Sequence, residues 1–118
     1  MRQRSVKNLE EKLELNSSFL IRTPREFKGK WLEEFDNKNP IYLEIGCGKG
    51  AFAIELAKRF PEYNVIAVEK CKNVILTACQ NAKAEEIPNL RFLCGGAEYL
   101  HRHLKNGCAE RIFLNFSC

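Results

Sequence analysis

A glycine-rich turn between an apolar strand and a helix constrains this chain more than any other feature. The turn reads GCGKG over residues 46–50, follows a strand that begins with an apolar run at 41–43 and precedes a helical pattern that begins at Ala51. Glycine has no Cβ, so such a turn can adopt positive φ and let a ligand approach its backbone. The helix behind it offers free N–H groups and the positive end of its dipole. The pattern predicts a site for a nucleotide-type ligand.

Length and composition indicate one small globular domain. The chain has 118 residues, of which 45% are hydrophobic and 29% charged, as is usual for folded proteins. No apolar run approaches the roughly 20 residues of a membrane-spanning helix. The basic N-terminus, MRQR, is not followed by the apolar segment of a secretion signal. We therefore expect a cytoplasmic protein.

The six cysteines are predicted to be free thiols. No two of them have CxxC spacing, and the only histidines are His101 and His103, so the sequence predicts no metal site. The cysteines at positions 47, 71, 79 and 94 fall in the glycine turn or in predicted strands and helices, where cysteine serves as a small apolar residue.

The rest of the chain alternates between predicted strands and helices. Strands are predicted at 41–45, 64–69, 90–94 and 111–116, with helices near 51–60, 71–86 and 97–105 between them. In the first of these helices, the spacing places Phe52, Leu56 and Phe60 on one face, with Ala53 and Ala57 beside them. Such a series predicts an α/β fold with a parallel sheet and helices on both faces. Ligands of such sheets bind at the carboxyl ends of the strands.

The N-terminal segment is basic. Residues 1–30 hold eight Lys or Arg and four Glu, which accounts for the whole formal net charge of +4. Leu9 and Leu13 have helical spacing, and a further helix is predicted from Pro24 to Phe35. A basic arm is a typical electrostatic footprint for nucleic acid, but a solvated arm without a partner would carry the same charge.

Two cofactors fit the glycine turn. Gly46, Gly48 and Ala51 satisfy the dinucleotide pattern GxGxxA, and Glu69 lies where an acid would bind a ribose. S-adenosylmethionine sites have an acidic residue two positions before the first of three alternate glycines, and Glu44 supplies it. This acid would attract the ammonium and sulfonium of S-adenosylmethionine, whereas it would repel the phosphates of NAD. The sequence favours S-adenosylmethionine.

Longer segments resemble the bacterial tRNA (guanine-N7-)-methyltransferases. They are KGKWLEEFDNKNPIYLEIGCGKGAF at 28–52, VIAVEK at 65–70, NLRFLCGGAEYL at 89–100 and RIFLNFS at 111–117. The resemblance implies a Rossmann-like methyltransferase fold and methyl transfer from S-adenosylmethionine to N7 of a variable-loop guanosine in tRNA. It also implies two parts, a basic arm with a helix at 1–40 and a cofactor-binding half-domain at 41–118.

The resemblance also assigns roles to single residues. The cofactor would be held by Glu44, Gly46, Gly48, Gly50, Glu69, Gly96 and Ala97. Within this set, Glu44 and the glycines would hold its methionine end and Glu69 its ribose hydroxyls. The candidates for contacts with tRNA phosphates are Arg22, Arg25, Lys28 and Lys30.

Two departures from the family pattern concern the site. Gly96-Ala97 stands where the family reads Asp-Ala, which removes a side chain near the adenine. The family continues its fourth strand as Asn-Phe-Ser-Asp-Pro-Trp, and Cys118 occupies the position of that Asp, which is implicated in the reaction. A cysteine there lacks an identified activating base, so we expect it to be non-functional.

These departures predict a chain that is truncated after the fourth strand and lacks the C-terminal strands. We expect weak or no methyl transfer by the chain alone, and self-association through the open fourth strand. Two alternatives remain open at this stage. One is a non-catalytic remnant that binds S-adenosylmethionine or RNA, and the other is an NAD-binding oxidoreductase fragment.

Overall fold

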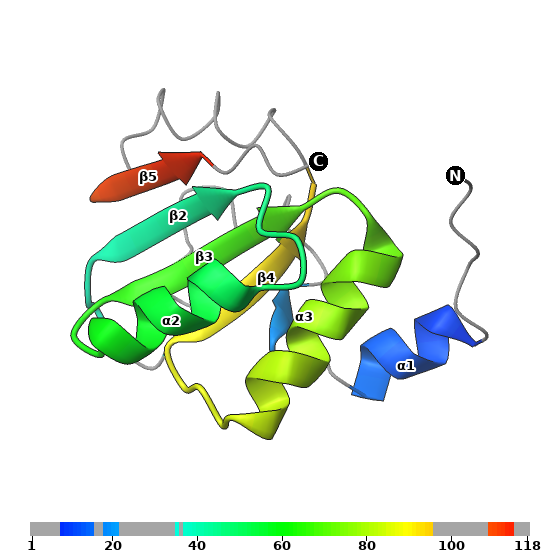
Figure 1. Ribbon diagram of the computed structural model, residues 1–118. Helices are drawn as coiled ribbons and strands as arrows, with labels where there is room; N and C mark the ends of the chain where they lie inside the picture. Colours follow the sequence, from blue (N-terminus) through cyan, green and yellow to red (C-terminus); the bar gives the residue numbers. More distant parts are fainter. Residues whose placement is uncertain (1–7, 16–17, 22–34, 36, 96–108, 115–118) are drawn as a thin grey trace.

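The computed structural model describes residues 8–15, 18–21, 35, 37–95 and 109–114 (Figure 1). Its helices and strands are α1 (Leu9–Leu15), β1 (Leu20–Ile21), β2 (Ile41–Ile45), α2 (Ala51–Arg59), β3 (Asn64–Glu69), α3 (Lys72–Ala84), β4 (Leu90–Cys94) and β5 (Arg111–Leu114). The predicted strands at 41–45, 64–69 and 90–94 are confirmed. In the described part of the chain, no helix is long and apolar enough to cross a bilayer.

All five strands form one parallel sheet in the order β1-β4-β3-β2-β5. From β2 the chain moves outward to β3 and β4, and it then returns to add β5 on the other side of β2. This reversal of strand order makes β2 the switch point of the sheet. Sheets of this type bind ligands beside such a switch point, at the carboxyl ends of the strands.

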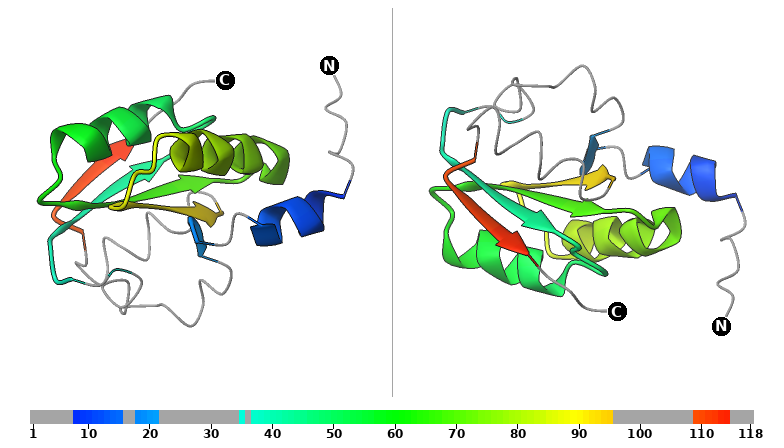
Figure 2. Two further views of the ribbon diagram at one scale, coloured as in Figure 1. Left: turned by 90° about the horizontal axis from the view of Figure 1, so that it is seen from below. Right: turned by 90° about the horizontal axis from the view of Figure 1, so that it is seen from above.

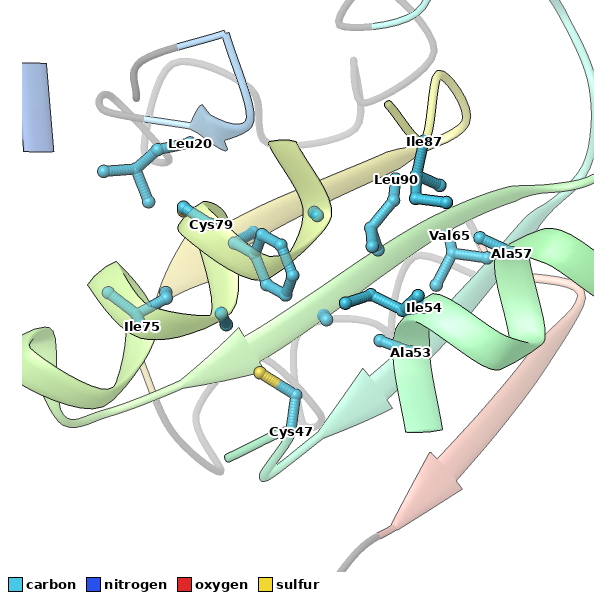
Figure 3. Packing of buried hydrophobic residues seen from close by; sticks show 14 of the residues in the cluster. Leu20, Cys47, Ala53, Ile54, Ala57, Val65, Ile75, Cys79, Ile87 and Leu90 are labelled. Atoms are coloured by element: carbon cyan, nitrogen blue, oxygen red, sulfur yellow. The ribbon is translucent and has the colours of Figure 1, made fainter. Parts of the chain in front are cut away.

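Helices α2 and α3 lie on the same face of the sheet (Figure 2). They pack against Val65 and Ala67 of β3 and Phe92 of β4, in a core seen in Figure 3. The opposite face also has an apolar core, which includes Leu43 and Ile66. Strands buried on both faces are characteristic of α/β folds. The other two predicted helices, at 24–35 and 97–105, lie almost entirely outside the described residues.

The predicted apolar face of α2 was partly wrong. Phe52 and Phe60 are 43% and 36% exposed, whereas Leu56 and the neighbouring Ala53 and Ala57 are buried. Alanines allow the helix to approach the sheet closely, so the bulky rings lie at its flank. The Phe52 ring lies edge-on to the Phe113 ring, with 5.5 Å between the ring centroids. The Phe60 ring lies edge-on to the Tyr42 ring, with 5.8 Å between the centroids.

The N-terminal segment contributes a strand that the sequence did not predict. β1 pairs with β4, and the carbonyl of Phe19 accepts a hydrogen bond from the N–H of Phe92 at 2.6 Å. The predicted helix around Leu9 and Leu13 is confirmed as α1, and Leu13 is buried in the core beneath α3. The division of the chain at residue 40 stays a prediction.

Candidate functional site

The glycine loop is fixed to the end of β3 by its own backbone. The N–H groups of Gly46 and Cys47 both donate to the carbonyl of Val68, at 2.8 and 3.0 Å. Positive φ values of 83°, 57° and 88° occur at Gly46, Gly48 and Gly50. The loop therefore needs backbone conformations that residues with a Cβ rarely adopt. The predicted turn between strand and helix is confirmed.

Gly48 and Gly50 are glycines for different reasons. A Cβ on Gly50 would lie 3.1 Å from Cβ of Ala78 and 3.3 Å from Cζ of Phe92, so its absence lets the loop pack against α3 and β4. A Cβ on Gly48 would meet nothing within 4 Å. The backbone of Gly48 therefore borders open space, and a ligand can approach it there.

Glu69 links the glycine loop to the start of α3. Its Oε1 accepts a hydrogen bond from the N–H of Gly48, and its Oε2 accepts one from the N–H of Cys71, both at 3.0 Å. Its carbonyl oxygen accepts a third bond, from the N–H of Gly95 beyond β4. Each carboxylate oxygen keeps a further lone pair for a hydroxyl donor. Glu69 thus connects the segments that follow β2, β3 and β4 at the carboxyl edge of the sheet.

We expect Glu69→Gln to lower the free energy of unfolding by about 1.5–3 kcal/mol, the usual worth of a hydrogen bond to a charged group. The amide NH₂ of glutamine cannot accept from either Gly48 or Cys71, so one backbone N–H would lose its partner. Chemical denaturation would measure the change, with Glu62→Gln on the exposed turn before β3 as the control. Equal stability of the two variants would contradict the role of Glu69 as a link.

Glu44 provides a buried carboxylate beneath the loop. It belongs to β2, has an exposed fraction of 0%, and lies in register with Ala67 of β3 and Phe113 of β5. Burial, with smaller contributions from the charges of Glu44 and Glu69, raises the pKa of the Cys47 thiol far above its usual range. Both carboxylates therefore lie close enough to Cys47 to act on its thiol, and they could attract a cationic group of a ligand.

The cysteines of the described residues are free thiols, as predicted. Cys47 and Cys79 are buried, and burial raises the pKa of Cys79 to about 12. Both remain neutral near pH 7 and behave as small apolar side chains. Cys71 and Cys94 are partly exposed. Within the described ranges, no group of three or more His, Cys, Asp or Glu side chains could hold a metal ion.

The structure brings five of the predicted cofactor residues together, namely Glu44, Gly46, Gly48, Gly50 and Glu69. Their contacts with a cofactor stay a prediction. Gly96, Ala97 and Cys118 lie outside the described residues, as do Arg22, Arg25, Lys28 and Lys30.

Sequence reasoning missed a side chain that supports the loop. Nδ2 of Asn81, on α3, donates to the carbonyl of Lys49 at 3.2 Å. It also missed Ala78 and Phe92, the residues that require Gly50 to be a glycine. These partners lie far from the loop in sequence, and no local motif marks them.

A parallel sheet with this switch point and a glycine loop after β2 defines a Rossmann-like fold. Solved structures agree. One is a 30S ribosomal A1408 methyltransferase from an uncultured bacterium, with a TM-score of 0.60 and 19% identity over 74% of this chain and 42% of that one. Another is an antibiotic-related methyltransferase, with a TM-score of 0.57 and 20% identity over 100% of this chain and 50% of the other.

The chain itself belongs to the family described as "Putative methyltransferase", which matches residues 38–118. Its relatives include proteins named tRNA (guanine-N(7)-)-methyltransferase. That of Pediococcus pentosaceus is 40% identical over 99% of this chain and 55% of its own length. That of Listeria innocua is 41% identical over 91% of this chain and 50% of its own length. The predicted resemblance is confirmed, and the chain spans about half the length of these relatives.

Proposed function

We propose that this chain is the S-adenosylmethionine-binding half of a tRNA (guanine-N7-)-methyltransferase. One observation carries the proposal. The open backbone of Gly48 lies next to a carboxylate, that of Glu69, in a loop built above the buried Glu44. The names of relatives near 40% identity support the choice of substrate.

The residues present fit the cofactor. The space beside Gly48, where a Cβ would meet nothing, accommodates a ligand against the backbone. Glu44 and Glu69 would favour an ammonium or sulfonium group, and the remaining lone pairs of Glu69 would accept ribose hydroxyls. The backbone at Gly96 and Ala97 would border the adenine. When bound, S-adenosylmethionine supplies an electrophilic methyl group.

Methyl transfer to guanine N7 needs alignment more than acid–base chemistry. N7 carries an available lone pair, so no strong base is required. Holding the two reactants in line can contribute roughly 7–11 kcal/mol to catalysis. Because the chain spans about half of its relatives' length, we expect it to bind the cofactor, and expect efficient transfer to need residues outside the matched part. Cys118 is not expected to contribute. The proposed place of action is the cytoplasm.

Two experiments test this function. Titration calorimetry with S-adenosylmethionine and with NAD determines which cofactor binds, and NAD binding alone would favour the oxidoreductase alternative.

A chimera tests the reaction. In it, this chain replaces the matched part of the Pediococcus pentosaceus relative. We expect the chimera with Cys118→Asp, which restores the family's aspartate, to transfer labelled methyl groups to N7 of guanosine in unmodified tRNA, and the chimera that keeps Cys118 to transfer them more weakly. A folded chimera that binds the cofactor without methylating tRNA would favour the non-catalytic alternative.

We also propose that the chain self-associates through β5. This strand ends the described sheet, and Leu114 on it is 48% exposed. Strands at a sheet edge offer backbone groups for pairing with another chain. Sedimentation analysis of the chain and of a Leu114→Lys variant would test this. A dimer that persists unchanged in the variant would contradict pairing through β5.

A further inference from the structure

Three lysines surround the carboxyl edge of the sheet at the candidate site. Lys49 lies in the glycine loop, Lys70 directly follows β3, and Lys72 is the first residue of α3; all three are exposed. We call this set the lysine rim. The hydrogen bonds from Gly48 and Cys71 to the carboxylate of Glu69 hold the two segments side by side. The backbones of Lys49 and Lys70 are therefore neighbours, although they lie far apart in sequence.

The nearby acidic residues leave the charge of the rim largely uncompensated. Glu44 is buried, and the carboxylate of Glu69 faces the backbone N–H groups of Gly48 and Cys71. Within the described part of the chain, no carboxylate lies within ion-pair distance of Lys49 or Lys70.

Lys72 is the exception in the rim. Its Nζ lies 3.6 Å from Oε1 of Glu10 on α1, and the two side chains are 56% and 61% exposed. Exposed pairs of this kind are usually worth less than about 1 kcal/mol. A phosphate could therefore displace Glu10 at little cost.

We propose that the lysine rim binds phosphates of the RNA backbone and holds the substrate against the open side of the glycine loop. This inference rests on the proposed function and names a contact surface apart from the N-terminal arm. Lysines act as point charges on phosphates, which fixes the position of a nucleic acid without reading its sequence. The rim borders the glycine loop and the segment after Glu69, so its contacts would hold an RNA close to the proposed cofactor site.

The test compares two double variants of the 118-residue chain with equal loss of charge. Lys49→Gln/Lys70→Gln removes the two rim lysines without an ion pair. The control, Lys38→Gln/Lys83→Gln, removes two exposed lysines before β2 and near the end of α3. Fluorescence anisotropy over a range of salt concentrations measures tRNA affinity, and calorimetry measures the affinity for S-adenosylmethionine.

We expect the rim variant to bind tRNA roughly tenfold more weakly near 0.1 M salt. The slope of log affinity against log salt should fall by about one for each lysine removed. The control variant should keep the parental affinity and slope, and both variants should keep their cofactor affinity. Lys72→Gln alone should have a smaller effect, because Glu10 already neutralises part of that charge.

Three results would overturn the rim. They are equal losses in the two double variants, no tRNA binding by the parent chain, or loss of cofactor affinity together with RNA affinity. The proposed function fails separately. If the chimera does not methylate tRNA, but the rim variant loses RNA affinity and the control variant does not, the proposal for the rim stands and the proposed methyl transfer is wrong.

Discussion

Gly50→Ala is expected to lower the free energy of unfolding by about 2–5 kcal/mol. A left-handed conformation costs a residue with a Cβ about 1–2 kcal/mol, and overpacking a core adds typically 1–3 kcal/mol. Gly50 meets both conditions, because its φ is +88° and its new Cβ would lie 3.1 Å from Cβ of Ala78 and 3.3 Å from Cζ of Phe92. Neither neighbour can move aside easily, since both are fully buried. The loss is large against a typical total stability of 5–15 kcal/mol.

Urea denaturation of the parent and variant chains measures this loss, and Gly48→Ala is the matched control. The φ of Gly48 is +57°, and its new Cβ would meet nothing within 4 Å, so only the conformational cost of about 1–2 kcal/mol remains. The control should lose affinity for the cofactor instead, since the methyl group would enter the open space beside the loop. Equal destabilisation by the two variants would show that Gly50 is not a packing residue.

The strands of the sheet could be predicted wherever the local sequence pattern was enough to identify them. The strands β2, β3 and β4 are mainly apolar, with Glu44 in β2 and Arg91 in β4 as interior exceptions, and turn-forming residues such as Pro40, Pro61 and Pro88 precede them. β1 could not be predicted, because a strand of two residues has no periodicity. Its pairing with β4 depends on contacts between segments far apart in the chain.

The buried face of α2 shows a second limit. Phe52 and Phe60 satisfy the helical spacing as well as Leu56 does, and periodicity alone cannot rank them. The structure selects Ala53 and Ala57 because small residues shorten the distance between helix and sheet. The aromatic rings then find partners on β2 and β5 at the helix flank.

The residues of the candidate site in the described part of the chain could be predicted from the sequence, but the separate structural role of each residue could not. The loop motif treats Gly48 and Gly50 as equivalent, yet only Gly50 is confined by other side chains. Glu69 was predicted as a ribose ligand, and its carboxylate also accepts two backbone hydrogen bonds that hold the loop. These roles depend on which segments the sheet brings together, and the spacing of residues along the chain does not contain that information.

Glu44→Gln is expected to weaken the binding of S-adenosylmethionine by about tenfold to a hundredfold. Glutamine keeps the shape of the side chain and removes its charge, so the loss corresponds to one charge-assisted interaction of about 1.5–3 kcal/mol. Stability should stay close to that of the parent chain, because a neutral amide is less costly to bury than a carboxylate. Titration calorimetry measures the affinity for S-adenosylmethionine, and thermal unfolding measures the stability.

A comparison of ligands identifies which cationic group Glu44 attracts. S-adenosylhomocysteine keeps the ammonium group and lacks the sulfonium, so equal losses for the two ligands indicate the ammonium, and a loss confined to S-adenosylmethionine indicates the sulfonium. Glu55→Gln is the control, since Glu55 lies on α2 with a side chain that is 60% exposed. Unchanged affinity for both ligands, combined with a large drop in stability, would make Glu44 a structural residue and remove the main electrostatic argument for S-adenosylmethionine over NAD.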